Sequence, residues 1–326
     1  MRRVVRGALI VLGLLAATAA WSDERGADAR VAVRAHNVDI LVSDTISAHL
    51  IDLTAELVPR PGHPLVDLED GGSFTIRVTA GCARLSADQL TRLFNDRILD
   101  YEPRALNDVH FMPEDGAMQV SGGVRLWHRV PPFWLAFKAT TNAGVDDDGL
   151  IRLTVRDEHL LGLPVGGLLD LAHTPLDALL TVEAPGARVA GNTVIIDTRA
   201  VLPGPAIDSR PVSARLSAAG LTVCFKGDAT KSAPALPADL DAPGSYLWVQ
   251  GPRLAALGQE IAPARLLVAP EFDTGSETRA STNEPLLFRL VKSRDQIAAG
   301  HIELGIDGRM IIRPGPAQPG TPSQNR

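Results

Sequence analysis

The sequence predicts an α+β protein built mainly from antiparallel β-strands, and two observations support this fold class. Apolar and polar residues alternate with a period of two in many short segments, which is typical of strands with one buried face and one wet face. Turn-forming pairs such as Asp-Gly and Gly-Asn separate these segments, while only two stretches show the helical spacing of hydrophobic residues. A parallel α/β sheet would instead show continuous apolar strands between regular helices.

The first strands are expected at 38–42, 51–57 and 74–78. In the second strand the apolar residues fall on odd numbers and the polar residues on even numbers, so one face is dry. The residues assigned to that dry face are Ile51, Leu53, Ala55 and Leu57.

The clearest helix follows the third strand and begins at Ser86. Ser86 and Gln89 have the spacing of a capping box, in which each side chain bonds the backbone N–H of the other residue. Hydrophobic residues then recur at helical intervals and form one apolar stripe. The stripe consists of Leu90, Leu93, Phe94 and Ile98. A second helix is expected within 160–180, where Pro164 could occupy its first turn.

Two strands at 118–126 and 134–141 flank the corner Val-Pro-Pro-Phe-Trp and turn their apolar faces the same way. The pair Gly122-Gly123 indicates a bulge or a sharp bend in the first strand. Phe133 and Trp134 at the corner either plug the end of the core or form an exposed lip that enters a membrane interface, where Trp is favoured.

Later strands are expected at 151–155, 194–196 and 212–216, and the last of these has Val212, Ala214 and Leu216 on its dry face. The stretch from Asp146 to Gly149 has too few correctly spaced carboxylates for a calcium loop and predicts a hairpin turn.

The N-terminal residues 1–22 have the order of a secretory signal peptide: arginines, an uncharged apolar run, then small residues before Asp23. The run is shorter than the roughly 20 apolar residues that span a bilayer, so it is either cleaved or kept as a short anchor. The protein is therefore expected in the periplasm or elsewhere in the cell envelope.

The remaining chain divides by composition. Residues 30–227 form the main β-rich domain, 228–244 are rich in Ala, Pro and Asp and predict a linker or long loop, and 316–326 form a polar, Pro-rich disordered tail. The segment 245–315 is again strand-like, with a hairpin at Asp307-Gly308, and either continues the same sheet or stands apart.

Composition and missing motifs exclude several functions. The net charge of -6 without a basic block argues against a nucleic-acid partner. The sequence contains no HExxH, no GxSxG elbow, no phosphate-binding glycine loop and no cysteine–histidine set for zinc, so we expect no enzyme activity, no metal and no cofactor. Cys82 and Cys224 either form a disulfide, which export would permit, or remain two thiols.

The number of one-faced strands leads to a functional hypothesis. At least seven such strands present more apolar surface than two short helices can cover. The sheet must curl on itself, or wrap around a helix and leave an aliphatic groove suited to acyl chains, whose burial contributes about 0.8 kcal/mol per methylene. The residues expected to line this groove, with Phe133 and Trp134 at its lip, are Leu90, Leu93, Phe94, Ile98, Val120, Val124, Leu126, Phe137, Leu153 and Val155.

The order of elements resembles a known family. The segments PGHPLVDLEDGGSFTIRVTAG, SADQLTRLFNDRIL, DGAMQVSGGVRLW and DDGLIRLTV follow one another as in the LmeA-like phospholipid-binding proteins of the tubular lipid-binding (TULIP) superfamily, and the resemblance covers roughly 38–225. It implies a highly curved antiparallel sheet wrapped around a long helix, an apolar tunnel that holds lipid, and a role in envelope lipid binding or transfer. An exposed lip of Phe133 and Trp134 would add peripheral contact with a membrane.

Two alternatives remain at the level of sequence. One is a structural or scaffolding β-protein of the envelope whose core is filled by its own side chains. The other is a hydrolase whose serine, histidine and aspartate come together only on folding, because a catalytic triad has no fixed order in sequence.

Overall fold

The computed structural model describes residues 29–102, 104–114, 117–125, 134–161, 176–179, 182, 184–202, 204–227, 234–236, 244–270, 284–289, 293–304 and 308–315. Within these residues the protein is mostly antiparallel β-sheet with few helices, as the sequence predicts. The predicted signal peptide at 1–22, the predicted tail at 316–326, most of the predicted linker, Leu126 and Phe133 lie outside the described residues. Of the second predicted helix, only the single turn α4 (Leu176–Leu179) is described as helical.

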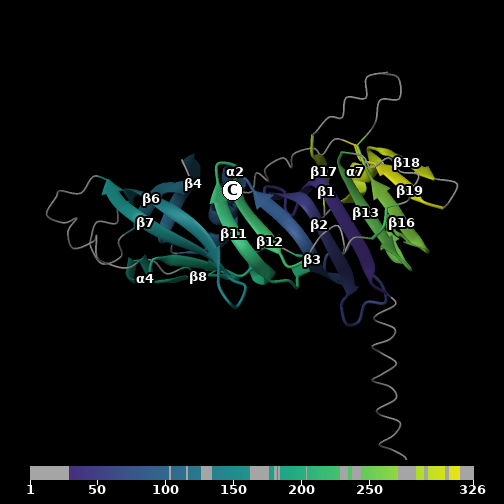
Figure 1. The fold of residues 1–326 in the computed structure, drawn as a ribbon, viewed down its shortest axis with the longest axis horizontal. Helices are drawn as coiled ribbons and strands as arrows, with labels where there is room; N and C mark the ends of the chain where they lie inside the picture. Colours follow the sequence, from purple (N-terminus) through teal and green to yellow (C-terminus); the bar gives the residue numbers. More distant parts are fainter. Residues whose placement is uncertain are drawn as a thin grey trace, which may run out of the picture.

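An eleven-stranded sheet forms most of the molecule, in the order β11-β12-β3-β2-β1-β13-β16-β19-β18, with β10 beside β3 and β17 beside β1 (Figure 1). Three pairs are parallel, β10 with β3, β17 with β1 and β16 with β19. Its strands are β1 (Val31–Leu41), β2 (Ser47–Pro59), β3 (Phe74–Leu85), β10 (Ala206–Ile207), β11 (Pro211–Ser217), β12 (Gly220–Phe225), β13 (Tyr246–Gly251), β16 (Ala264–Val268), β17 (Leu286–Arg289), β18 (His301–Leu304) and β19 (Met310–Arg313).

A six-stranded antiparallel sheet lies at one end of the elongated molecule, in the order β4-β5-β6-β7-β9-β8 (Figure 1). Its strands are β4 (Leu106–Glu114), β5 (Ala117–Arg125), β6 (Trp134–Val145), β7 (Ile151–Leu161), β8 (Ala187–Ala190) and β9 (Thr193–Ile196). A short hairpin of β14 (Leu254–Ala256) and β15 (Gln259–Ile261) stands apart from both sheets.

The C-terminal strands continue the large sheet. Strand β13 pairs with β1 from Ala32 opposite Gln250 to His36 opposite Tyr246, and β16, β19 and β18 follow outward. Since β1 pairs with β2 on its other edge, the N-terminal strand is the centre of the sheet. The described strands β13, β16, β17, β18 and β19 of the segment 245–315 therefore belong to the same sheet.

The first hydrophobic core surrounds the helix that begins after Ser86. Helix α2 (Ala87–Leu93) continues as one π-helical turn, η1 (Phe94–Ile98), and α2 contacts β4 of one sheet and β12 and β3 of the other. Ser86 accepts a hydrogen bond from the backbone N–H of Gln89, as predicted. Gln89 does not return the bond, because its side-chain oxygen accepts the N–H of Ser47 at 2.7 Å. Only half of the predicted capping box forms.

Two residues that the sequence assigns to buried strand faces lie on the solvent-exposed side. Ile51 is 36% exposed and Val212 is 55% exposed. The register between β2 and β3 shifts between Leu50 and Asp52, and that between β11 and β12 shifts between Pro211 and Ser213. Each misassigned residue is thus the extra residue of a β-bulge, which inverts the alternation locally.

The predicted bend at Gly122-Gly123 has a partner on the neighbouring strand. The register between β4 and β5 shifts between Asn107 and His110, and Asp108 has a positive φ of 50°. A Cβ atom on Gly122 would lie 2.9 Å from the backbone oxygen of Asn107, closer than side chains tolerate. The irregularity is therefore in β4, and the glycine allows the two backbones to approach.

Two further predictions concern the chain's polar chemistry. A disulfide joins Cys82 of β3 to Cys224 of β12, and the two residues face each other in the register of the large sheet.

The Asp146–Gly149 stretch is the predicted hairpin turn between β6 and β7, where Asp146 accepts the backbone N–H of Leu150 at 2.9 Å. That hydrogen bond is the main reason why the pKa of Asp146 is lowered. Across the described residues no group of three potential metal ligands is present.

Candidate functional site

A cavity of about 110 Å³ lies in a second hydrophobic core, on one face of the large sheet. Its floor is formed by alternate residues of β1, β2, β13 and β16, which the strand register places side by side: Val33 opposite Val249, and Ala35 opposite Leu247. The lining residues are Val33, Ala35, Ile40, Leu50, Leu53, Ala55, Leu57, Leu68, Glu69, Ile76, Leu247, Val249, Ala256, Leu257, Leu266, Val268, Phe288, Ser293, Ile297 and Ile312. The wall is almost entirely aliphatic.

The roof of the cavity consists of three short pieces of chain: the β14–β15 hairpin, the turn at 66–69 and helix α7 (Ser293–Ala298). Two backbone hydrogen bonds hold the hairpin to the turn, from Ala255 N–H to Val66 O at 2.8 Å and from Leu68 N–H to Ala255 O at 3.0 Å. Leu254 is fully buried and anchors the hairpin. A hairpin held to its neighbouring turn by two such bonds among the described residues can open at lower cost than the sheet below it.

The turn of the hairpin is conformationally costly. Leu257 and Gly258 are its two central residues, and both have positive φ angles, 56° and 72°. Two-residue turns of this kind favour Asn-Gly, because a residue with a large side chain pays about 1–2 kcal/mol for the left-handed conformation. The Leu257 side chain lines the cavity. Such strain is often found at ligand clamps, which makes this turn a functional candidate.

Replacing Leu257 by asparagine is expected to leave the free energy of unfolding nearly unchanged. Relief of the left-handed leucine, about 1 kcal/mol, offsets the lost contact of a half-buried side chain, also about 1 kcal/mol. The matched control is Leu254→Ala in the same hairpin, which removes a fully buried side chain and should cost about 2–5 kcal/mol. Urea denaturation measures both, and a loss above about 2 kcal/mol for Leu257→Asn would show that the turn is not strained.

The cavity has one polar corner. Among its described lining residues, Glu69 is the only ionisable one, and Ser293, which is buried, also lines the cavity. The Nε atom of Arg294 lies 3.3 Å from Oε1 of Glu69, and the Arg294 side chain is 62% exposed. A Cβ atom on Gly258 would lie 3.1 Å from Nη2 of the same arginine. The ion pair therefore sits where all three pieces of the roof meet.

The volume of the cavity limits what it holds in this conformation. An engineered cavity of about 150 Å³ accepts benzene, and drug-sized ligands occupy about 300–1,000 Å³. The 110 Å³ observed is about three quarters of that benzene-sized cavity and is therefore enough for about four carbon atoms. A longer chain enters only if the roof moves.

The predicted lining residues lie elsewhere. The residues from the Ser86 helix and Leu153 are buried together in the first core, with Val120 and Phe137 packed against it. Val124 belongs to a small cluster with Ala105 and Leu135, Val155 is half-buried, and Trp134 is 42% exposed. None of the predicted lining residues that the structure describes borders the cavity of the second core.

The cavity was missed because its walls come from both ends of the chain. The alternation in β1, β2 and β3 is visible in the sequence, but the pairing of β1 with β13 is not. One local signal was available: a leucine directly before Gly258 between two short apolar segments, where a tight turn ordinarily carries Asn or Asp.

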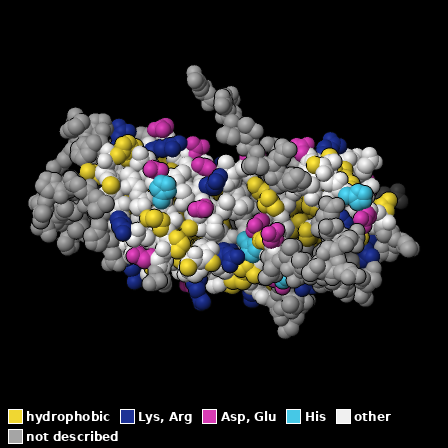
Figure 2. All heavy atoms as spheres, turned by 90° about the horizontal axis from the view of Figure 1, so that it is seen from above, with side chains coloured by type: hydrophobic (Ala, Val, Ile, Leu, Met, Phe, Trp, Pro, Cys, Tyr) yellow, Lys and Arg dark blue, Asp and Glu magenta, His cyan; other side chains and the backbone are white. Residues whose placement is uncertain are grey.

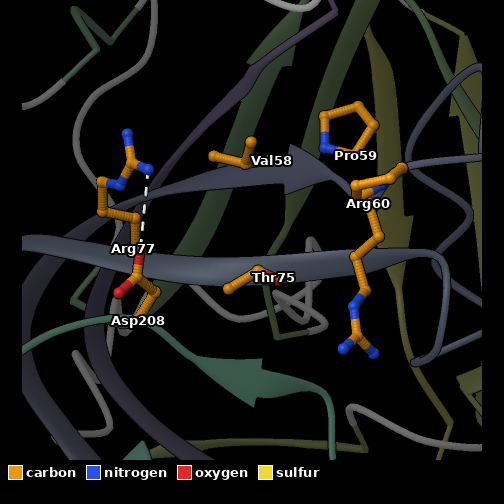
Figure 3. A pocket seen from close by; sticks show the side chains of 7 residues that line it. Val58, Pro59, Arg60, Thr75, Arg77 and Asp208 are labelled. Atoms are coloured by element: carbon orange, nitrogen blue, oxygen red, sulfur yellow. Dashed lines mark ion pairs between the residues drawn. The ribbon is translucent and has the colours of Figure 1, made fainter.

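A second hollow, of about 360 Å³, lies at the ends of β2 and β3 and is lined by Val58, Pro59, Arg60, Pro61, Thr75, Arg77 and Asp208. In Figure 3 the guanidinium groups of Arg60 and Arg77 point away from each other. Arg77 also lies 3.5 Å from Asp208 and 3.9 Å from Glu56. The two arginines therefore do not form an anion clamp. On the molecular face seen in Figure 2, basic and acidic side chains are likewise interspersed.

Comparison of the chain with models of known protein families, with curated protein sequences and with solved structures found no match. Among the described residues, no helix combines the length and the apolar character needed to cross a membrane.

Proposed function

We propose that this protein is an exported, non-enzymatic lipid-binding protein of the cell envelope, which holds an acyl chain in the cavity of its second core. One observation supports this most directly: an aliphatic cavity under a small roof, with a single polar corner. Ligand sites are typically apolar pockets with few polar groups of this kind. The packing of α2 and η1 between strands of both sheets agrees with the resemblance to the tubular lipid-binding proteins.

The energetics require the roof to open. About four buried methylenes contribute about 3 kcal/mol, which is less than the cost of immobilising a ligand. A chain of ten or so methylenes contributes about 8 kcal/mol and gives useful affinity. Only movement of the β14–β15 hairpin, the 66–69 turn or α7 would make that room. The strained Leu257 turn is the most suitable hinge among them.

Two features support the proposed location and partner. The Cys82–Cys224 disulfide is of the kind that persists in oxidising compartments outside the cytoplasm. Trp134, exposed at the start of β6, is suited to peripheral contact with a membrane surface, where Trp is favoured. In this proposal a membrane phospholipid is the first candidate for the ligand.

Native mass spectrometry of the full-length protein, purified from the envelope fraction of a cell that exports it, tests the proposal. We expect adducts with the mass of a phospholipid, and solvent extraction should release the same species. A preparation that carries no lipid, and takes none up from phospholipid vesicles, would contradict the proposal.

Filling the cavity is expected to abolish lipid uptake without unfolding the protein. Ala35→Leu places an isopropyl group into the floor, where its own burial offsets the strain of a tight fit. The matched control, Ala32→Leu, carries the same change on the opposite face of β1, beside Glu56 and Gln250. Vesicle-to-protein transfer of a fluorescent fatty-acyl lipid measures the effect. Equal uptake by both variants would place the lipid elsewhere.

The packing of the first core favours a second candidate, a structural envelope protein. Here the residues once expected to line a tunnel are buried against one another, including Phe94 and Phe111, whose ring centroids are 4.8 Å apart. If neither core took up lipid, the extended sheet itself would be the functional element.

A further inference from the structure

Glu69 carries an unused hydrogen-bond acceptor at the edge of the cavity. Its Oε1 atom is buried and accepts no hydrogen bond from any group in the described residues. A buried acceptor without a donor is costly, so proteins rarely keep one unless something else supplies the donor. Because Glu69 lines the cavity, that donor can come from a ligand.

The turn that carries Glu69 holds it in place. The backbone N–H of Glu69 donates to Oδ1 of Asp67 at 2.9 Å, and the N–H of Asp67 donates to the hydroxyl of Ser73 at 3.0 Å. Ser73 is itself buried, and its hydroxyl donates to the carbonyl oxygen of Asp70 at 2.7 Å. The backbone that carries the acceptor is thus preorganised, which lowers the entropy lost when a ligand binds.

Arg294 balances the charge of Glu69 but does not satisfy its acceptor. The distance of 3.3 Å from Nε to Oε1 is that of an ion pair, but the two atoms do not form a hydrogen bond. The arginine approaches from the solvent side, as its high exposure shows. Glu69 thus remains able to accept a hydrogen bond from a group that enters with the ligand.

We infer that the ligand is an amphiphile whose head group carries a hydrogen-bond donor, a hydroxyl or an ammonium group, which donates to Oε1 of Glu69 while the tail occupies the cavity. This inference rests on the proposed function, and names the head-group chemistry of the same site. The ammonium of a zwitterionic phospholipid and the hydroxyl of a neutral lipid both meet the requirement. A lone carboxylate head does not, because at neutral pH it has no donor for Oε1, and in the cavity it would face that oxygen while Arg294 lies on the solvent side.

Isothermal titration calorimetry with four ligands of equal tail tests the inference: decanol, decylamine, decyl methyl ether and decanoate. We expect decanol and decylamine to bind the full-length protein about tenfold or more tightly than the ether, which lacks only the donor. Decanoate should bind most weakly. Glu69→Leu should reduce the affinity for decanol to that for the ether and leave the ether's affinity unchanged or higher.

Two more variants separate the effect of the hydrogen-bond acceptor of Glu69 from the effect of its negative charge. Glu69→Gln keeps a side-chain acceptor but removes the negative charge, so decanol binding should persist while decylamine binds more weakly than it does to the wild type. Glu260→Gln removes a carboxylate from β15 of the roof that does not line the cavity, and should change nothing. Melting curves show whether each variant is folded. If Glu69→Leu does not fold, the Glu69→Gln variant still tests the inference.

The outcomes distinguish the two proposals. If all four ligands bind equally, or decanoate binds best, the head-group inference is wrong while tail binding stands. If none of them binds, the proposed function itself fails, and the inference with it.

Discussion

Replacing Phe94 by alanine is expected to lower the free energy of unfolding by about 3–5 kcal/mol, the usual cost of deleting a well-packed buried phenyl ring. Phe94 is buried in the first core between the two sheets, and its ring packs against Phe111 at a centroid distance of 4.8 Å. The cavity left behind has no route to collapse, because α2 and strands on both sides hold its walls apart. Urea denaturation followed by circular dichroism measures the loss.

The Phe94 variant is compared with a control in which an exposed aromatic side chain is removed. Trp134→Ala removes a larger aromatic side chain that is 42% exposed, and should cost much less than the Phe94 variant. A loss below about 1 kcal/mol for Phe94→Ala would mean that the ring faces open or lipid-filled space. In that case the tunnel predicted from the sequence would run through the first core, and the second core would not be the lipid site.

Removing the disulfide is expected to lower the free energy of unfolding by about 2–5 kcal/mol. Cys82 and Cys224 are separated by 142 residues, and the intervening chain contains the whole six-stranded sheet together with α2 and η1. A crosslink that closes so long a loop restricts the unfolded chain strongly, which is the main source of disulfide stabilisation in the chain-entropy model. We expect the double variant Cys82→Ala, Cys224→Ala to show this loss in urea denaturation.

A reducing agent provides the matched comparison for the disulfide. It should destabilise the wild-type protein by a similar amount and leave the double variant unaffected. If reduction leaves the wild-type stability unchanged, the crosslink either does not form in the protein or closes a loop that the unfolded chain already keeps compact.

Several features of the fold were predictable because they depend on neighbours in sequence. The apolar stripe from Leu90 to Ile98 is buried as its helical spacing predicts, since that spacing places all its members on one side of the helix. The turn at Asp146 likewise follows from local side-chain chemistry. By contrast, Ile51 and Val212 were assigned to the wrong face, because a bulge depends on register against another strand.

The candidate site also combines a feature that the sequence predicts with one that it does not. The sequence indicated an apolar surface larger than its helices could cover, and the structure covers most of it by packing one sheet against α2, η1 and the other sheet. One gap among the described residues lies beside the β14–β15 hairpin, and none of the described residues expected to line a groove borders it. No periodicity could have located it, because periodicity reports which side of a strand is dry and not which element covers that side.

By itself, the sequence determined the fold class, the stripe of the Ser86 helix and the hairpin turn at Asp146–Gly149. These follow from the period of two in a strand, the period of 3.6 in a helix and the backbone preferences of turn residues. Only the tertiary structure decided that β13 pairs with β1, that the two cysteines meet, and that Glu69 faces an aliphatic cavity. Each of these contacts joins residues distant in the chain, whose pairing is set by the packing of the whole molecule.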